Sequence, residues 1–325
     1  MLAAVNHHYI RTSFNSKYPS IFGLTPQEFE SRLKILSKWG RFISQQELRH
    51  LINKGQELPD RSIVITFDDG LKEQYDLALP ILKKLNIPAI FFISTKVYEQ
   101  TEILNVHKIH LVRSKVSTTT LLKYMVEFVS DRNIDLDLAH SKMKGVEHYK
   151  YDSPDHAMLK YALNFLLNKD ELNHFINDVF ETEFKGEEEA IHENLYMSKN
   201  EVQLLGQMDY IGSHSHDHDP LGLKDVQYQR EQAIHSKRIL EGIADTEIYG
   251  FSYPYGGYEA CKGLHTVLKQ SGYDYAFTME RAINCTLDNQ FYLSRFDNND
   301  MPGGKSFSKN SDDFFKEYNF ASWKF

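Results

Sequence analysis

The stretch Ser62-Ile-Val-Ile-Thr-Phe-Asp-Asp-Gly70 decides the fold class of this chain. Its first six residues are mostly apolar and β-branched without alternation, the pattern of a strand that is buried on both faces of a sheet. Two carboxylates, Asp68 and Asp69, follow where the strand ends. Because side chains alternate along an extended chain, we expect the two to point in different directions. A plain Asp-Asp-Gly turn with a left-handed glycine is the alternative interpretation.

Strands and helices alternate on both sides of this stretch. A helix predicted over about 74–85 and a second apolar strand, 89–93, complete a β-α-β unit. Capping signals, such as Thr25-Pro-Gln-Glu28, predict further helix starts at Ser44 and Ser198. Other strands are predicted before Asn6 and at 209–213, 248–253, 275–278 and 291–295, with helices at 25–39, 226–243 and 260–270. This order predicts an α/β fold with a parallel sheet or barrel, in which functional residues gather at the C-terminal ends of strands.

The middle of the chain has a different character. Residues 106–197 are rich in Lys, Glu and Leu, and helical periodicity recurs at 120–129, 157–167 and 171–180. No strong strand pattern occurs there. We therefore predict a helical insertion at 106–197 between an N-terminal part, 1–105, and a C-terminal part, 198–325, of one barrel.

Composition excludes several classes of protein. The chain has 325 residues and a formal net charge of −8, so a nucleic-acid partner or an anionic membrane surface is not expected. Cys261 and Cys285 are too few for a disulfide framework, which fits a reducing compartment. We find neither a secretory signal pattern nor a long apolar run, and expect a cytoplasmic protein without a membrane span unless a leader has been removed. The oligomeric state is left open.

A histidine cluster, His214-Ser-His-Asp-His218, follows another predicted strand. If the segment turned helically, His214 and His218 would lie at i and i+4 on one face, which is a metal-ligand spacing. Two imidazoles and one carboxylate leave open positions for water and substrate, and they suit Zn²⁺ or another divalent transition metal. An exposed histidine-rich loop is the alternative. The end of a third strand, Phe251–Gly257, contains Pro254 and two glycines and by itself reads as an ordinary turn.

Together these three segments resemble the polysaccharide deacetylase family, also called the NodB-homology family or carbohydrate esterase family 4. Thr66-Phe-Asp-Asp-Gly70 and His214-Ser-x-x-His218 match two family motifs, and Ser252-Tyr-Pro-Tyr255 stands where the family has Arg-x-Pro-Tyr. The resemblance covers about 62–93 and 198–297.

The resemblance implies a distorted (β/α) barrel with one metal ion, Zn²⁺ being the expected one. It makes Asp69, His214 and His218 the metal ligands and Asp68 the general base. It also makes the backbone N–H of Tyr255 a donor to the developing oxyanion.

The chain departs from the family pattern in two places. Ser252 replaces the arginine that orients the base, as in the exopolysaccharide poly-N-acetylglucosamine deacetylase branch that this chain also resembles, and Arg295 is the candidate substitute. No Leu-x-His motif follows Arg295 to supply the general acid. In that same branch an N-terminal Tyr-His segment stands in for it, which makes His8 the candidate here, provided that the barrel places the first strand beside the last. A packed or exposed histidine is the alternative reading of His8.

The function expected from this resemblance is the hydrolysis of N-acetyl groups of an amino sugar in a polysaccharide, oligosaccharide or glycan precursor. The expected cytoplasmic location favours a nucleotide-linked or lipid-linked precursor. Two alternatives stay open. One is removal of another small acyl group such as formyl, which the same catalytic set would serve. The other is a catalytically silent glycan-binding protein on the same fold.

Overall fold

The computed structural model describes residues 1–19, 23–134, 137–148, 153–301, 304, 307 and 314–323. Contacts divide the chain into two compact units. Unit 1 comprises 1–12, 23–101 and 192–325, and unit 2 comprises 13–22 and 102–191. Within the described residues, no helix combines the length and the apolar character needed to cross a bilayer.

Unit 1 is built on a parallel sheet that is nearly closed into a barrel. The described residues form eight strands, in the order β7-β6-β5-β4-β3-β1-β8, with β2 also paired to β3. Leu293 exchanges two backbone hydrogen bonds with the β7 segment, to Thr278 and Ala276, and so brings the two edges together. The strands are β1 (Leu2–His7), β2 (Arg41–Phe42), β3 (Ser62–Phe67), β4 (Ala89–Ile93), β5 (Ile211–Ser213), β6 (Gly250–Ser252), β7 (Tyr275–Phe277) and β8 (Arg295–Asp297).

The first and last strands are neighbours, as expected. Ala4 of β1 pairs with Val64 of β3 on one side and with Arg295 of β8 on the other. This position of β1 carries the segment that contains His8 to the same barrel end as Asp68.

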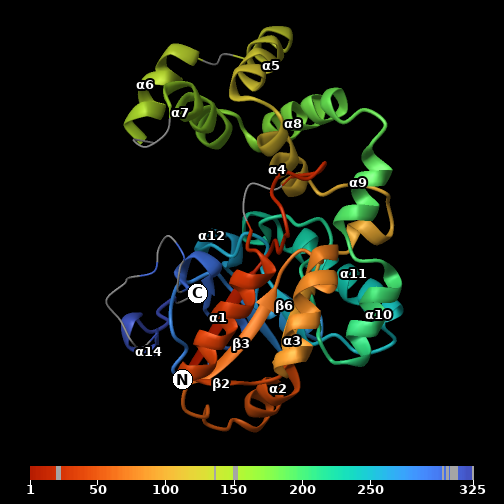
Figure 1. The fold of residues 1–325 in the computed structure, drawn as a ribbon, viewed down its shortest axis with the longest axis vertical. Helices are drawn as coiled ribbons and strands as arrows, with labels where there is room; N and C mark the ends of the chain where they lie inside the picture. Colours follow the sequence, from red (N-terminus) through yellow and green to blue (C-terminus); the bar gives the residue numbers. More distant parts are fainter. Residues whose placement is uncertain are drawn as a thin grey trace. The chain divides into compact units, whose positions relative to one another are not determined.

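Helices cover the outside of the barrel in unit 1 (Figure 1). Phe29 and Leu33, one turn apart on α1, are fully buried in the same core cluster as Phe67 and Phe91 of the strands. Such an apolar stripe at helical spacing binds a helix to a sheet. The helices are α1 (Pro26–Trp39), α2 (Gln45–Lys54), α3 (Leu79–Leu85), α10 (Lys199–Gln207), α11 (Val226–Ala244), α12 (Tyr258–Cys261), α13 (His265–Gln270) and α14 (Phe314–Glu317).

Three predicted elements differ from the observed ones. The helix predicted over 74–85 starts as a π-helical turn, Gln74–Ala78, because Pro80 has no N–H for a regular helix bond. The helix predicted over 260–270 is broken into α12 and α13, with Gly263 between them at φ +79°. The strand predicted over 291–295 is a 3₁₀ turn followed by β8, because the chain changes partner from β7 at Leu293 to β1 at Arg295.

Unit 2 is helical. Its helices are α4 (Asn105–Lys115), α5 (Thr118–Asp131), α6 (Leu138–His148), α7 (Pro154–Tyr161) and α8 (Lys169–Glu183), and α9 (Glu188–Leu195) begins in it. Phe128 of α5 meets Phe175 of α8 edge to face at 5.4 Å between ring centroids. The helical periods predicted at 120–129 and 171–180 fall in α5 and α8, whereas the period at 157–167 spans α7 and a π-helical turn, Ala162–Leu166.

Candidate metal centre and its surroundings

The carboxyl ends of β3, β5 and β6 bring the predicted site residues together. Asp68 and Asp69 follow β3 directly, and His214 follows β5. Arg295 begins β8, beside the middle of β1. Asp69 and His214, which are 145 positions apart in sequence, thus meet at one barrel end, because the carboxyl ends of parallel strands all lie at the same end of a barrel.

The turn after β3 separates the two carboxylates. Asp69 has φ 81° and Gly70 has φ 72°, so both residues are in the left-handed region. A Cβ at Gly70 would lie 2.9 Å from Cγ2 of Ile93, which leaves room for glycine only. Asp68 and Asp69 are each 2% exposed, and each points to different partners. The turn with a left-handed glycine is therefore present, but both of its carboxylates are buried, so it is not a solvated surface turn.

Asp69 and two histidines form a cluster that fits a metal ion. Oδ1 of Asp69 lies 3.5 Å from Nε2 of His214 and 3.3 Å from Nε2 of His218. Nδ1 of His214 is 2.8 Å from the carbonyl oxygen of Ser252, which can only accept, so Nδ1 carries the hydrogen and Nε2 has the lone pair. Burial lowers the pKa of His214 to about 4, which keeps the ring neutral. A carboxylate oxygen and two imidazole nitrogens at this spacing are a donor set for a divalent transition metal.

The histidine segment is a loop and not the helical turn that the i, i+4 spacing had suggested. Ser215 and His218 adopt left-handed conformations with φ 61° and 60°, and Oγ of Ser215 accepts the N–H of His218 at 3.2 Å. Ser94 holds the start of the loop through a hydrogen bond to the carbonyl of His214. Two strained residues within five mark a segment whose shape the surroundings impose, as at many functional sites.

Asp68 is held as a buried carboxylate. Arg295 donates to both of its oxygens, at 2.9 and 2.8 Å, and Nδ2 of Asn6 donates to Oδ2 at 2.9 Å. Burial alone would raise the pKa of Asp68, but the charge of Arg295 and its hydrogen bonds hold that pKa well below its usual range. The group is thus an ionised acceptor.

Arg295 forms hydrogen bonds to several groups around Asp68. Its side chain is fully buried and also donates to the carbonyl of Thr278, to Oγ1 of Thr66 and to Oγ of Ser252. Ser252, at the position of the family arginine, therefore touches the guanidinium that lies on Asp68. The geometry places Arg295 where the sequence predicted a substitute.

His8 and Tyr255 lie at the rim of this site. His8 is half-buried, and its carbonyl accepts from Nε2 of Gln74, which also donates to the carbonyl of Asp68. The charge of His8 is among the influences that lower the pKa of Asp68. Tyr255 has φ 63° and is 56% exposed, and its ring lies 5.2 Å from that of His218.

Sequence reasoning missed Asn6 and Gln74 as parts of the site. Asn6 is a polar residue in a fully buried strand, and it pairs in register with Thr66 of β3. A buried asparagine needs hydrogen-bond partners, and that signal could have identified it. Gln74 gave no such signal, because it lies at the start of the predicted helix that comes shortly after the Asp68-Asp69-Gly70 motif.

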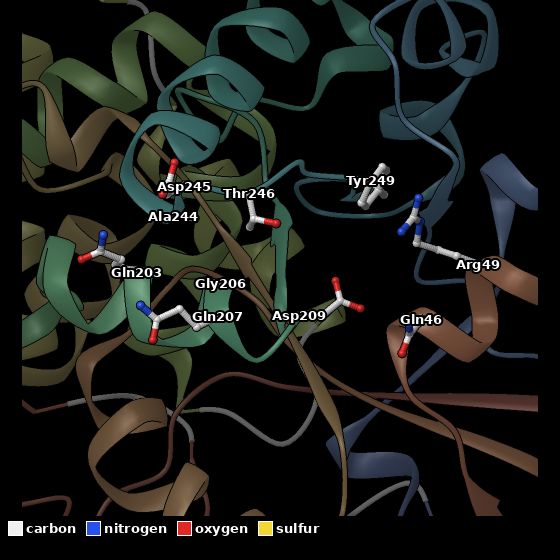
Figure 2. A pocket seen from close by; sticks show the side chains of 10 residues that line it. All are labelled: Gln46, Arg49, Gln203, Gly206, Gln207, Asp209, Ala244, Asp245, Thr246 and Tyr249. Atoms are coloured by element: carbon white, nitrogen blue, oxygen red, sulfur yellow. The ribbon is translucent and has the colours of Figure 1, made fainter.

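A polar cavity of about 460 Å³ lies at the opposite barrel end (Figure 2). Asp209 and Tyr249, which line it, precede β5 and β6, whereas His214 follows β5. Figure 2 shows Arg49 beside Tyr249, and its guanidinium lies 3.0 Å from the centre of that ring. This cavity is separate from the metal centre.

The chain is similar to known deacetylases. A poly-beta-1,6-N-acetyl-D-glucosamine N-deacetylase of Staphylococcus epidermidis is 32% identical over 123 residues, which cover 34% of this chain and 41% of that protein. The protein of the same name from Staphylococcus aureus is 35% identical over 103 residues, 28% of this chain and 35% of that protein. The chain thus matches less than half the length of these curated relatives.

Solved structures show the same fold. IcaB from Ammonifex degensii superimposes with a TM-score of 0.52 at 17% identity, over 91% of this chain and 90% of that one. Streptococcus pyogenes deacetylase PplD, in complex with acetate, has a TM-score of 0.51 at 15% identity, over 91% of both chains. The sequence profile of the polysaccharide deacetylase family matches residues 55–130 and 187–276, about half of the chain. The chain therefore belongs to the polysaccharide deacetylase family, and its barrel is of the NodB type.

Proposed function

We propose that this chain is a metal-dependent carbohydrate N-deacetylase that removes acetyl groups from an N-acetylated amino sugar in a polysaccharide, oligosaccharide or glycan precursor. One observation carries the proposal. The Asp69–His214–His218 cluster and the Asp68–Arg295 pair lie at one barrel end, with Oδ2 of Asp68 4.0 Å from Nε2 of His214. The names of the two staphylococcal relatives support β-1,6-linked N-acetylglucosamine as the first substrate to test.

In this proposal Asp69, His214 and His218 hold one divalent ion, and Zn²⁺ is the ion proposed. A set of two imidazoles and one carboxylate is typical of catalytic zinc sites, in which other positions stay open. When bound, the ion would act as a Lewis acid on the acyl oxygen and would lower the pKa of water.

Residues of the chain supply the general base, the oxyanion donor and the general acid. Asp68 accepts a proton from the water that adds to the acetamide carbon, and Arg295 and Asn6 hold its carboxylate in place. The backbone N–H of Tyr255 stabilises the negative charge that develops on the carbonyl oxygen. His8 donates a proton to the sugar nitrogen as the carbon–nitrogen bond breaks. The products are acetate and the free amine.

The test is acetate release from purified protein loaded with Zn²⁺. β-1,6-linked and β-1,4-linked N-acetylglucosamine oligomers are compared with their N-formyl analogues. Acetate released from at least one N-acetyl oligomer, and lost in the chelated protein, supports the proposal. Release of formate alone would point to a different acyl group, and binding of sugar without turnover would overturn the enzymatic assignment. The cytoplasmic location stays a prediction, which fractionation of cells producing the full-length protein tests.

A further inference from the structure

Three further side chains of types that can ligate a metal converge outside the cluster described above. They are Glu99, His216 and His235, and their ligand atoms all lie within 4.8 Å of one another. Nε2 of His235 is 2.8 Å from Oε2 of Glu99, and Nε2 of His216 is 3.8 Å from the same oxygen. The two imidazole rings meet edge to face, with centroids 4.4 Å apart.

The three side chains come from three separate elements of unit 1. Glu99 ends the 3₁₀ turn that follows β4, His216 stands in the histidine loop, and His235 projects from α11. His216 is 12% exposed, His235 33% and Glu99 41%, so the cluster opens to solvent on one side. Ions can therefore enter without a change of fold.

The surroundings prepare His216 as a ligand. Nδ1 of His216 lies 2.9 Å from Oγ1 of Thr95, which engages that nitrogen and leaves Nε2 toward Glu99. Backbone bonds from Thr95 and Lys96 to the carbonyls of Ser215 and His216 fix the loop beside the 3₁₀ turn. A hydrogen bond to the second ring nitrogen is the usual support of a metal-ligating histidine.

His235 is paired differently. Nη2 of Arg238 lies 3.0 Å from Nδ1 of His235, and an arginine only donates, so Nδ1 accepts and Nε2–H donates to Glu99. A cation can replace this Nε2 proton if the ring takes the other tautomer and Arg238 withdraws. Tetrahedral ligands at about 2.1 Å from zinc lie about 3.4 Å apart. The two distances from Oε2 of Glu99 to the imidazole nitrogens, 2.8 and 3.8 Å, lie on either side of that value, so small side-chain shifts would fit an ion.

We propose that Glu99, His216 and His235 form a second site for a divalent transition-metal ion, which clamps the histidine loop to the 3₁₀ turn after β4 and to α11. The donors are two imidazoles and one carboxylate, with open positions for water. The site shares no residue with Asp69, His214 and His218, and it stands independently of the proposed deacetylase activity.

Titration of metal-free protein with Zn²⁺, measured by calorimetry, tests the proposal. We expect the wild type to bind one equivalent more than His235→Ala does. His50→Ala, which removes an exposed histidine of α2, is the matched control and keeps the wild-type stoichiometry. His214→Ala should retain the second equivalent, so failure of the catalytic site and failure of this site are distinguishable. Equal stoichiometry of the wild type and His235→Ala would overturn the proposal.

Two further variants test the contacts that support or oppose metal binding at this site. Thr95→Val removes the hydroxyl that supports His216 and should weaken the second site about 10- to 100-fold, the usual effect of a lost supporting partner. Arg238→Gln removes the competing charge and should tighten it. Zinc beyond the first equivalent should raise the Tm of the wild type but not that of His235→Ala. No change of affinity in either variant would show an adventitious surface contact and count against a built site.

Discussion

Arg295 donates to both carboxylate oxygens of Asp68, at 2.9 and 2.8 Å, although 227 positions separate the two residues in sequence. The two residues meet because β8, the last strand in sequence, pairs with β1, and β1 pairs in turn with β3, which Asp68 follows. Arg295 also reaches Ser252, so a single guanidinium links the ends of β3 and β6 to the first residue of β8.

Asp68→Asn should leave metal binding intact and lower kcat about 10²- to 10⁴-fold, the usual contribution of general acid-base catalysis. The amide keeps the size of the side chain, and it leaves Asp69 and the histidines in place. Metal content and acetate release are measured on the same preparation. Wild-type turnover in this variant would place the base elsewhere.

Arg295→Met should destabilise the protein by about 3–5 kcal/mol, because it leaves the carboxylate of Asp68 buried without its counter-charge. Urea unfolding of unit 1, followed by tryptophan fluorescence, measures the change. The double variant Asp68→Asn/Arg295→Met removes the stranded charge and should recover part of the loss. If the double variant is no more stable than Arg295→Met, the loss comes from packing around the arginine.

Asp69→Asn should lower the metal affinity of the catalytic cluster and abolish deacetylation, because the amide removes the only anionic ligand of that cluster. Asp76→Asn is the control, since Asp76 is exposed and lies close by in sequence. Metal content after dialysis against a weak chelator is the measurement. Equal metal content in the two variants would refute Asp69 as a ligand.

The sequence predicted the barrel because its strands are apolar runs that end in recognisable polar motifs. Asp68, Asp69 and His214 could be named before the fold was known, since they follow such runs directly, and His218 could be named from its spacing to His214. Pairing of β1 with β8 was an expectation that the register Ala4 with Arg295 confirms.

Other features could not be read locally. Asn6 reaches Asp68 from the neighbouring strand, and only the register of β1 against β3 makes it part of the site. The left-handed residues Ser215 and His218 carry no glycine signal, so the conformation of the histidine loop could not be predicted from its sequence. The second cluster needs a residue of α11 beside one that follows β4, and neither segment carries a motif.

His7→Leu should make stability less sensitive to acid. Burial, with the charges of Arg32 and His8, lowers the pKa of His7 to about 3 in the fold, so the ring stays neutral there. The unfolded chain takes up a proton below about pH 6.5. This contribution to stability is therefore present above pH 6.5 and is lost as the pH falls toward 3, by about 2 kcal/mol between pH 7 and pH 5. Urea midpoints at both pH values measure it, and an equal loss in both proteins would contradict it.

His8→Gln should separate the general acid from its neighbour in β1. His7 packs between Phe29 and Phe67 in the core, whereas His8 lies past the end of the strand near Asp68. A general acid acts only while it is protonated, so kcat/KM of the wild type should fall at alkaline pH, and His8→Gln should lose that limb.

The same variant should lower kcat about 10²- to 10⁴-fold with the metal retained, whereas His7→Leu keeps both turnover and pH profile. The pH–rate profiles of the two variants, measured with Zn²⁺-loaded protein in the same substrate assay, decide which histidine is the general acid. If His7→Leu is the damaging change and His8→Gln is not, the proton comes from the core side of β1, and the alternation of faces along that strand has been misassigned. If neither variant changes the profile, His8 is a packed rim residue, and another group protonates the leaving amine.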